Sequence, residues 1–502
     1  MPVYILAHDI GTSGNKASVF DENGRLIASA GVGYPTKTPG LGWMEQSSDD
    51  WYRAVCEATR QVLSGLDASC VRAIGVSGQM MAALPVGSDG RPLRPAIMWS
   101  DCRASQEAEL LREQLGEHDF YRITGQPLSP NYPIAKILWL KQNRPEIYRK
   151  ATCFLQAKDY INLRLTGDGY FTDPTDAAYT CLYDITAGAW SKTLCDLADI
   201  DMQKLPQVVP CGTVIGHVCE QAARECGIPS GIPVVETAGD GSAAHLGAGN
   251  AQAGDGYICL GSSTWIVAAT PQLCFDEDSR MQSEPHVVQD LSVYLGTMQA
   301  GGLSYDWCRQ LLGGRFSFEE MDALAGQTPP GSRGTVFLPY IAGERSPWYD
   351  HRLNASFLGL RQDCAAGELI RSVMEGVAFN LALILDTIQK DAQVDTLTLI
   401  GGGARSRVWQ QILADILETP ILVAENVHEG TSLGAAMIAG VGAGIFPDFS
   451  VCRQFIRSSR TVRPDERTFA VYRREKEIFR DACHAMRALN ARIYALKGDL
   501  LP

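Results

Sequence analysis

A glycine-rich turn near the N-terminus brings together side chains suited to binding an anion. The residues Asp9-Ile10-Gly11-Thr12-Ser13-Gly14-Asn15-Lys16 lie between two apolar stretches. Glycines let the backbone turn tightly, so that successive N–H groups converge on a phosphate. Thr12 and Ser13 add hydroxyl donors and Lys16 adds a positive charge, whereas Asp9 would repel a phosphate unless Mg²⁺ lay between them. The pattern predicts a phosphate and metal site, although a plain hairpin whose turn is capped by Asp9 fits the same residues.

A second carboxylate, Asp240, stands between two glycines directly after the apolar stretch Ile232–Thr237. Phosphoryl transfer to an alcohol requires an oriented hydroxyl, cations on the phosphates and a group that accepts the proton. Asp240 is the candidate for that acceptor, and with Asp9 it is a candidate ligand of Mg²⁺. The alternative is that Asp240 only caps the helix expected over Ser242–Gly247.

Two further glycine-rich turns lie in the second half of the chain. Gly261-Ser262-Ser263-Thr264 follows the predicted strand Tyr257–Leu260, and Gly401-Gly402-Gly403-Ala404 follows Leu397–Ile400. The latter turn opens a predicted helix, whose N-terminus would favour a phosphate. Each turn alone is weak evidence, but three at matching places support a nucleotide site.

The elements around these turns predict two α/β domains. A chain of 502 residues exceeds one ordinary core. The first half opens with the strands Val3–Ala7 and Lys16–Phe20, and the second half repeats a strand, a turn and a returning strand from about residue 255. Strands joined by crossover helices indicate layered α/β structure, so we expect duplicated domains with a cleft between them.

The last segment, Phe469–Lys497, is predicted to be a long amphipathic helix. Apolar residues recur at Tyr472, Phe479, Met486 and Ile493. Packing against the body of its own chain is the favoured interpretation, and a homodimer formed through this surface is the alternative.

Composition excludes several other classes. The net charge is −13 and no lysine- or arginine-rich tract occurs, which argues against nucleic acid as a partner. The fifteen cysteines include no C-x-x-C pair, and no stretch of about 18 apolar residues occurs, so we expect a cytoplasmic protein with reduced thiols and no membrane partner. The chain also lacks a Walker A loop, a dinucleotide fingerprint after the first strand, a nucleophile elbow and an H-E-x-x-H zinc motif.

The motifs together resemble those of the FGGY carbohydrate kinases, and among them the xylulokinases most closely. The similarity extends from about Val3 to Ile445. Its main motifs are D-I-G-T-S-G at Asp9–Gly14, G-Q-M at Gly78–Met80, W-S-D-C-R at Trp99–Arg103, P-I-A-K-I-L-W-L at Pro133–Leu140, D-P-T-D-A-A at Asp173–Ala178, L-P-Y-I-A-G-E-R-S-P at Leu338–Pro347 and I-G-G-G-A-R-S at Ile400–Ser406.

The resemblance implies two ribonuclease-H-like domains of the actin, hexokinase and Hsp70 type. It places a sugar-binding domain at residues 1–248, an ATP-binding domain at 249–445 and a helical extension packed on the body at 446–502. It makes Asp240 the catalytic base and puts Asp9 near the metal. ATP and Mg²⁺ would be bound near Thr12, Ser13, Lys16, Gly261, Ser262, Gly301, Gly402 and Gly403. The sugar pocket would be lined or supported by Gln79, Met80, Met81, Trp99, Asp101 and Arg103. For the last three, a structural role in the pocket wall is nearly as well supported as direct contact with the sugar.

Two departures from the xylulokinase pattern concern the sugar. Met81 stands where xylulokinases usually have His, and Gly241 stands where they usually have Asn or a similar residue. Each change removes a hydrogen-bonding side chain from the expected pocket. D-Xylulose, converted to D-xylulose 5-phosphate, is the leading substrate. Three other acceptors remain open: gluconate, another ketose or polyol, and a quorum-sensing autoinducer. A less favoured alternative is an actin- or Hsp70-like ATPase function.

Overall fold

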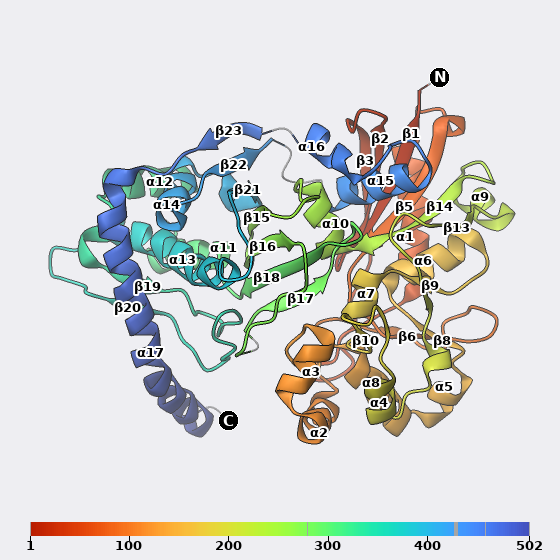
Figure 1. The fold of residues 1–502 in the computed structure, drawn as a ribbon, viewed down its shortest axis with the longest axis horizontal. Helices are drawn as coiled ribbons and strands as arrows, with labels where there is room; N and C mark the ends of the chain where they lie inside the picture. Colours follow the sequence, from red (N-terminus) through yellow and green to blue (C-terminus); the bar gives the residue numbers. More distant parts are fainter. Residues whose placement is uncertain (1, 279, 426–429, 457, 501–502) are drawn as a thin grey trace.

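The computed structural model describes residues 2–278, 280–425, 430–456 and 458–500. Two large lobes lie side by side in Figure 1, each built around a central β-sheet with helices packed against it.

The first sheet has the strand order β13-β14-β5-β1-β2-β3. β1 and β2 form a hairpin that β3 extends antiparallel, whereas β5 and β14 run parallel to β1. The turn between β1 and β2 holds the first glycine-rich sequence. The bounds are β1 Tyr4–Ile10, β2 Gly14–Asp21, β3 Leu26–Gly33, β5 Val71–Gly78, β13 Val214–His217 and β14 Pro233–Gly239.

The second sheet repeats this pattern in the order β17-β18-β16-β15-β21-β22-β23. β15 and β16 form the antiparallel hairpin, and β21 and β22 continue parallel to β15. The predicted duplication into two α/β domains is therefore confirmed. The bounds are β15 Asp255–Leu260, β16 Thr264–Thr270, β17 Gln282–Pro285, β18 Ser292–Met298, β21 Thr396–Ile400, β22 Ile421–Ala424 and β23 Ser458–Val462.

Helices cover both sheets. In the first lobe these are α1 Ser48–Val62, α2 Ser105–Leu115, α3 Glu117–Thr124, α4 Pro133–Asn143, α5 Pro145–Lys150, α6 Ala157–Thr166, α7 Pro174–Ala178, α8 Lys192–Leu197, α9 Glu220–Cys226 and α10 Asp240–Gly247. Later in the chain follow α11 Gly302–Leu311, α12 Phe318–Gln327, α13 Ala366–Ile388, α14 Arg407–Leu417, α15 Gly430–Gly442, α16 Cys452–Phe455 and α17 Phe469–Leu500.

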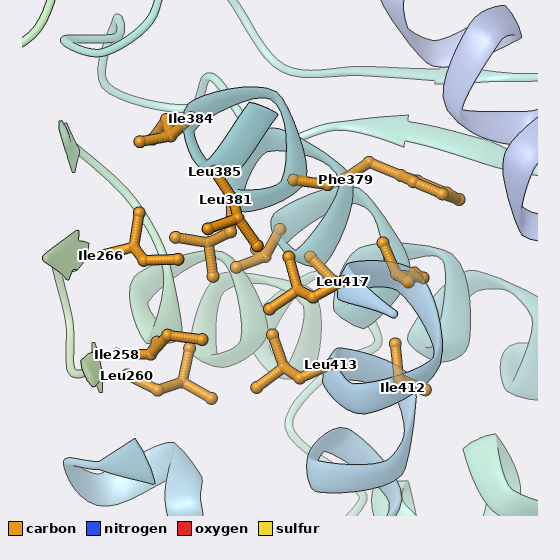
Figure 2. Close-up of a cluster of buried hydrophobic side chains, with 14 of the residues drawn as sticks. Ile258, Leu260, Ile266, Phe379, Leu381, Ile384, Leu385, Ile412, Leu413 and Leu417 are labelled. Carbon is orange, nitrogen blue, oxygen red and sulfur yellow. The ribbon is translucent and has the colours of Figure 1, made fainter. Parts of the chain in front are cut away.

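The core of the second lobe lies between its sheet and the helices α13 and α14. Figure 2 shows side chains from the strands, such as Ile258 and Ile266, facing Leu381 of α13 and Leu413 of α14, and all four are completely buried. Burying a large aliphatic side chain contributes about 1.5–3 kcal/mol, so this cluster stabilises the second sheet behind its glycine-rich turns.

Helix α15 joins the two lobes, because it comes from the second half of the sequence but packs on the first sheet. A Cβ at Gly75 of β5 would lie 2.7 Å from the carbonyl oxygen of Ala435, and one at Gly434 would lie 1.9 Å from that of Ala243 in α10. Glycine is therefore required where α15 crosses β5 and α10. The boundaries expected at residues 248 and 445 stay predictions.

The W-S-D-C-R motif precedes helix α2, which begins at Ser105, and the Asp101 carboxylate accepts the backbone N–H groups of Met44 and Arg103. The segment after residue 445 is not only helical, since β23 adds an edge strand to the second sheet.

The C-terminal helix α17 packs on its own chain. Tyr472, Phe479 and Cys483 are buried within the core of the second lobe. Within the described residues, no helix is both long and apolar enough to cross a membrane.

Candidate active site

Asp9 and Asp240 leave the first sheet at the same end. Asp9 of β1 is paired with Ser77 of β5, and Gly239 at the end of β14 is paired with the next residue of β5, Gly78. Only β5 therefore separates the two aspartates across the sheet. The carboxyl ends of parallel strands meet at one edge, which is where open α/β sheets bind their ligands.

The Asp240 carboxylate is a stronger base than an ordinary aspartate. Burial, and then the negative charge of Asp9, raise its pKa from 3.8 to about 7, against the opposing hydrogen bond from the Gly241 N–H. That N–H donates to Oδ1 at 2.7 Å. Because α10 begins at Asp240 itself, the carboxylate also lies at the positive end of a helix. The negative charge of Asp9 is therefore felt at Asp240 across β5.

The first glycine-rich turn presents its hydroxyl groups outward. Gly11 N–H donates to the Gly14 carbonyl at 3.0 Å, and the two residues between them, Thr12 and Ser13, are exposed. Lys16 is the cross-strand partner of Asp9, so it lies beside that carboxylate on β2. The predicted phosphate-binding side chains are therefore adjacent to Asp9.

The glycine-rich turns of the second lobe also gather at one place. Gly302 N–H donates to the Gly261 carbonyl at 2.7 Å, and Gly301 N–H donates to the Ser262 carbonyl at 2.9 Å. A Cβ at Gly301 would come within 1.7 Å of the Thr264 hydroxyl, so no larger residue fits there.

The third turn lies against the same strand end. Gly401 has φ +94°, and a Cβ there would lie 2.7 Å from the carbonyl oxygen of Leu260, which directly precedes Gly261. A Cβ at Gly403 would meet the Leu260 side chain at 2.5 Å, whereas Gly402 is exposed with open space around it. The turns at Gly261, Gly301 and Gly401 therefore meet at one end of β15, where Gly402 leaves open space.

Gln79 and Met80 connect the two aspartate strands. Gln79 N–H donates to the carbonyl of Ile10, next to Asp9, at 2.8 Å. Met80 packs on Gly239, where a Cβ would come within 2.5 Å of the Met80 side chain. The Gln79 side-chain oxygen is buried and has no hydrogen-bond partner within the described part of the chain. It is thus an acceptor without a partner in the segment that follows β5, between the strands that carry Asp9 and Asp240.

Trp99, Asp101 and Arg103 occupy different positions. Trp99 is 40% exposed, and its indole N–H donates to the Thr12 hydroxyl at 3.0 Å. Asp101 is completely buried, and Arg103 donates to its two oxygens at 2.9 and 2.7 Å. The Asp101 and Arg103 side chains are therefore paired with each other inside the protein, and of these three residues only Trp99 offers an accessible surface.

Sequence reasoning missed several polar residues that hold this region together. Gln46 donates to the Thr12 carbonyl at 2.7 Å and accepts from the Gln79 side chain at 2.9 Å. Glu45 pairs with Arg103 at 2.7 Å, and Lys136 bonds backbone carbonyls of two neighbouring loops. Gln46 and Glu45 carry no spacing signal in the sequence, whereas Lys136 belongs to the P-I-A-K-I-L-W-L motif but its role becomes visible only in its buried hydrogen bonds.

A further missed residue, Glu284 of β17, reaches α10 from the second sheet. Its Oε1 accepts from the Ser242 hydroxyl at 3.3 Å. Burial is the main cause that raises the pKa of Glu284 to about 7, and the Asp240 charge contributes. The helix that begins with Asp240 is therefore in contact with both sheets.

The residues present fit a magnesium ion held mainly by phosphate. Within the described ranges, no group of three or more His, Cys, Asp or Glu side chains could hold a metal by itself. Mg²⁺ is usually held by one or two carboxylates together with substrate phosphates and water. Asp9 and Asp240 supply such a pair of carboxylates.

Comparison with known proteins identifies the family. Residues 4–247 match the N-terminal domain of the FGGY family of carbohydrate kinases, and residues 256–443 match its C-terminal domain. A xylulose kinase of Staphylococcus xylosus is 30% identical over 89% of this chain and 92% of its own length. A gluconokinase of Bacillus subtilis is 30% identical over 95% of each chain.

Solved structures agree with the sequence comparison. The crystal structure of a ligand-bound xylulose kinase from Lactobacillus acidophilus has a TM-score of 0.92 and 28% identity, covering 98% of this chain and 99% of that one. A gluconate kinase from the same organism gives the same TM-score, identity and coverage. The fold, the motifs and both domain matches lead to one conclusion: the chain belongs to the FGGY family of carbohydrate kinases and is a sugar kinase.

Proposed function

We propose that this kinase transfers the γ-phosphate of Mg-ATP to a hydroxyl of a small ketose or polyol, with Asp240 as the general base. The observation that carries the proposal is the Asp9–Asp240 pair, in which burial and the Asp9 charge raise the pKa of Asp240 to about 7. A general base is most effective when its pKa lies near the working pH.

In this mechanism the protein mainly positions the acceptor hydroxyl and stabilises the negative charge of the phosphates. Asp240 orients the acceptor hydroxyl and takes its proton as the oxygen attacks the γ-phosphorus, while ADP leaves. Lys16 and the backbone N–H groups of the glycine-rich turns bind the phosphates. When bound, Mg²⁺ neutralises phosphate charge, and Asp9 with Asp240 would hold it. Gly261, Ser262, Gly301, Gly402 and Gly403 would border the nucleotide.

The sugar site is proposed around Gln79, Met80, Met81 and Trp99, with Asp101 and Arg103 as its structural support. The unpaired Gln79 oxygen supports a contact with a sugar hydroxyl. A Cβ at Gly241 would have nothing within 4 Å, so the place of the usual Asn side chain is open. The open space at Gly241 and the apolar Met81 are reasons to test acceptors other than D-xylulose as well.

D-Xylulose is the first proposed acceptor, because xylulose kinases are prominent among the similar proteins. Gluconate is the second, because a gluconokinase and a gluconate kinase match equally well. An ADP-release assay with D-xylulose, other ketoses, gluconate, polyols and an autoinducer precursor tests the proposal. One acceptor should raise ADP release far above the acceptor-free rate. Equal ADP release with and without every acceptor would instead indicate an ATPase.

The Asp9→Asn variant tests the electrostatic coupling. Because the Asp9 charge raises the pKa of Asp240, removing it should lower that pKa. The wild-type kcat/KM should fall as the pH drops below about 7, where Asp240 becomes protonated, and this acid limb should move to lower pH in the variant. The measurement is kcat/KM for the accepted substrate against pH. An unmoved limb in Asp9→Asn would contradict the coupling.

A second copy of the chain is the proposed protein partner. On the last turns of α17, Leu489, Ile493 and Leu496 are 44%, 37% and 57% exposed, which supports burial against another molecule. Light scattering after size exclusion should give twice the 54.5 kDa chain mass, and Ile493→Glu should give the monomer mass. A monomeric wild type would refute the dimer without affecting the kinase proposal.

A further inference from the structure

A completely buried lysine, Lys136 of α4, joins the two segments that carry the proposed sugar site. Its ammonium donates to the carbonyl oxygen of Met81 at 2.8 Å and to that of Met98 at 2.7 Å. Met81 ends the segment that begins with Gln79, and Met98 directly precedes Trp99. These two segments are separated in sequence, and within the described residues Lys136 is the side chain that donates to carbonyls of both.

Met81 needs such support because its backbone is strained. Its φ is +64°, in the left-handed region that is unfavourable for a residue other than glycine. The Met81 N–H is bonded to the Gln156 side-chain oxygen, while its carbonyl is bonded to Lys136. Gln156 is itself held by its donation to the Asp176 carbonyl at 2.7 Å. Both polar groups of the strained peptide are therefore fixed by buried side chains.

The second segment is held just as firmly. The Met98 carbonyl accepts from Lys136 and also from the Asp101 N–H at 3.1 Å. Trp99 follows immediately and donates to the Thr12 hydroxyl. A shift of Met98 would therefore move the accessible face of Trp99 and its contact with the phosphate-binding turn.

We infer that Lys136 is a positioning residue: it holds residues 79–81 and 98–99 in the arrangement that binds the acceptor, an inference that rests on the proposed function. Burying a lysine costs free energy, so a residue that only filled the core here would be apolar. Burial lowers the pKa of Lys136 to about 7, although Asp101 partly opposes this effect. Since its charge is disfavoured rather than stabilising, methionine in its place should be tolerated by the fold.

The test compares Lys136→Met with Lys141→Met. Lys141 lies on the same helix but is paired with Asp199 at 2.7 Å, away from both segments. Lys136→Met should raise KM for the acceptor about tenfold with KM for ATP unchanged, because small displacements of positioning groups have large effects. Lys141→Met should behave like the wild type. If Lys136→Met proves insoluble, Gln156→Met takes its place in the test. This variant removes the other support of Met81 and should raise the same KM.

Hydrogen exchange separates this inference from the proposed function. Amides of residues 79–84 and 97–101 should exchange faster in Lys136→Met than in wild type or Lys141→Met, whether or not any tested acceptor is phosphorylated. Unchanged exchange in these segments would overturn the inference. Faster exchange with an unchanged acceptor KM would also overturn it, because Lys136 would then serve the fold alone. A wild type that phosphorylates no acceptor would refute the proposed function, while hydrogen exchange would still decide whether Lys136 holds the two segments.

Discussion

Replacing Asp240 with Asn will lower kcat by about 10²–10⁴-fold, the usual contribution of proton transfer by a positioned side chain. Asn has nearly the same shape and keeps an acceptor oxygen for the Gly241 N–H, which donates to Asp240 at 2.7 Å. The fold and the binding of ATP should therefore be retained. Steady-state ADP release measures kcat, and calorimetric titration with a non-hydrolysable ATP analogue measures binding. Retention of more than about a tenth of wild-type kcat would refute the role as base.

The same variant should also be more stable than the wild type at high pH. A higher melting temperature would show that the loss of activity does not come from unfolding. The folded-state pKa of Asp240 is raised to about 7, above its ordinary value of 3.8. Its favourable contribution is therefore complete below about pH 4 and is lost as the pH rises towards 7. Asp240→Asn should melt above the wild type at pH 8, and the difference should shrink towards pH 4. Asp196→Asn, at an exposed helix position paired with Lys192, is the matched control with no expected change in either quantity.

Replacing Lys158 with Met should destabilise the protein by about 3–5 kcal/mol, the usual cost of removing one partner from a buried ion cluster. Lys158 is completely buried and lies within 3.4 Å of the carboxylates of Asp159, Asp173, Asp176 and Glu236. Without the lysine these carboxylates would lose the one positive charge that compensates them among the described residues. Burial is the main cause that raises the pKa of Glu236 to about 7.

The Lys158 cluster also borders the catalytic strand. Glu236 belongs to β14, which delivers Asp240, and the Gly239 N–H donates to the Thr175 hydroxyl at 3.3 Å. Thr175 in turn donates to Asp173 at 2.6 Å. Activity should therefore fall together with stability.

Thermal melting tests this prediction, with Lys192→Met as the control. Lys192 is 78% exposed and pairs with Asp196, so its loss should change the unfolding free energy by less than about 1 kcal/mol. The loss in Lys158→Met should be larger at pH 8 than at pH 5, because the uncompensated carboxylates ionise as the pH rises. Equal melting temperatures for Lys158→Met and the wild type would show that the lysine does not stabilise the cluster.

The sequence predicted the elements whose signals are local. Apolar strands ending in glycine-rich turns gave β1, β14 and β15, and with them the positions of Asp9 and Asp240. Packing between distant segments was not predictable in this way. The helix α15 reads as an ordinary buried helix, and only the structure reveals that Gly434 of α15 lies on Ala243 of α10. The strand β23, S-S-R-T-V, has too few apolar residues to be recognised before its partner β22 is known.

The same distinction applies to the site. Gln79 and Trp99 were predicted to line the sugar pocket, whereas Gln46 and the role of the motif residue Lys136 were found only through their buried hydrogen bonds. For Asp101 and Arg103 the sequence left direct contact and structural support open. Their burial and their bonds to each other and to Glu45 favour support, because buried groups that are engaged by protein partners have little capacity left for a sugar.

The role of Asp240 is tested most directly by the rate of a single turnover, measured against pH with ATP and the accepted substrate both saturating. In the wild type this rate should decline as the pH falls through the range where the residue 240 carboxyl takes up a proton. The much slower rate of Asp240→Asn should show no such decline. An Asn variant that keeps the wild-type pH dependence would mean that another group accepts the proton.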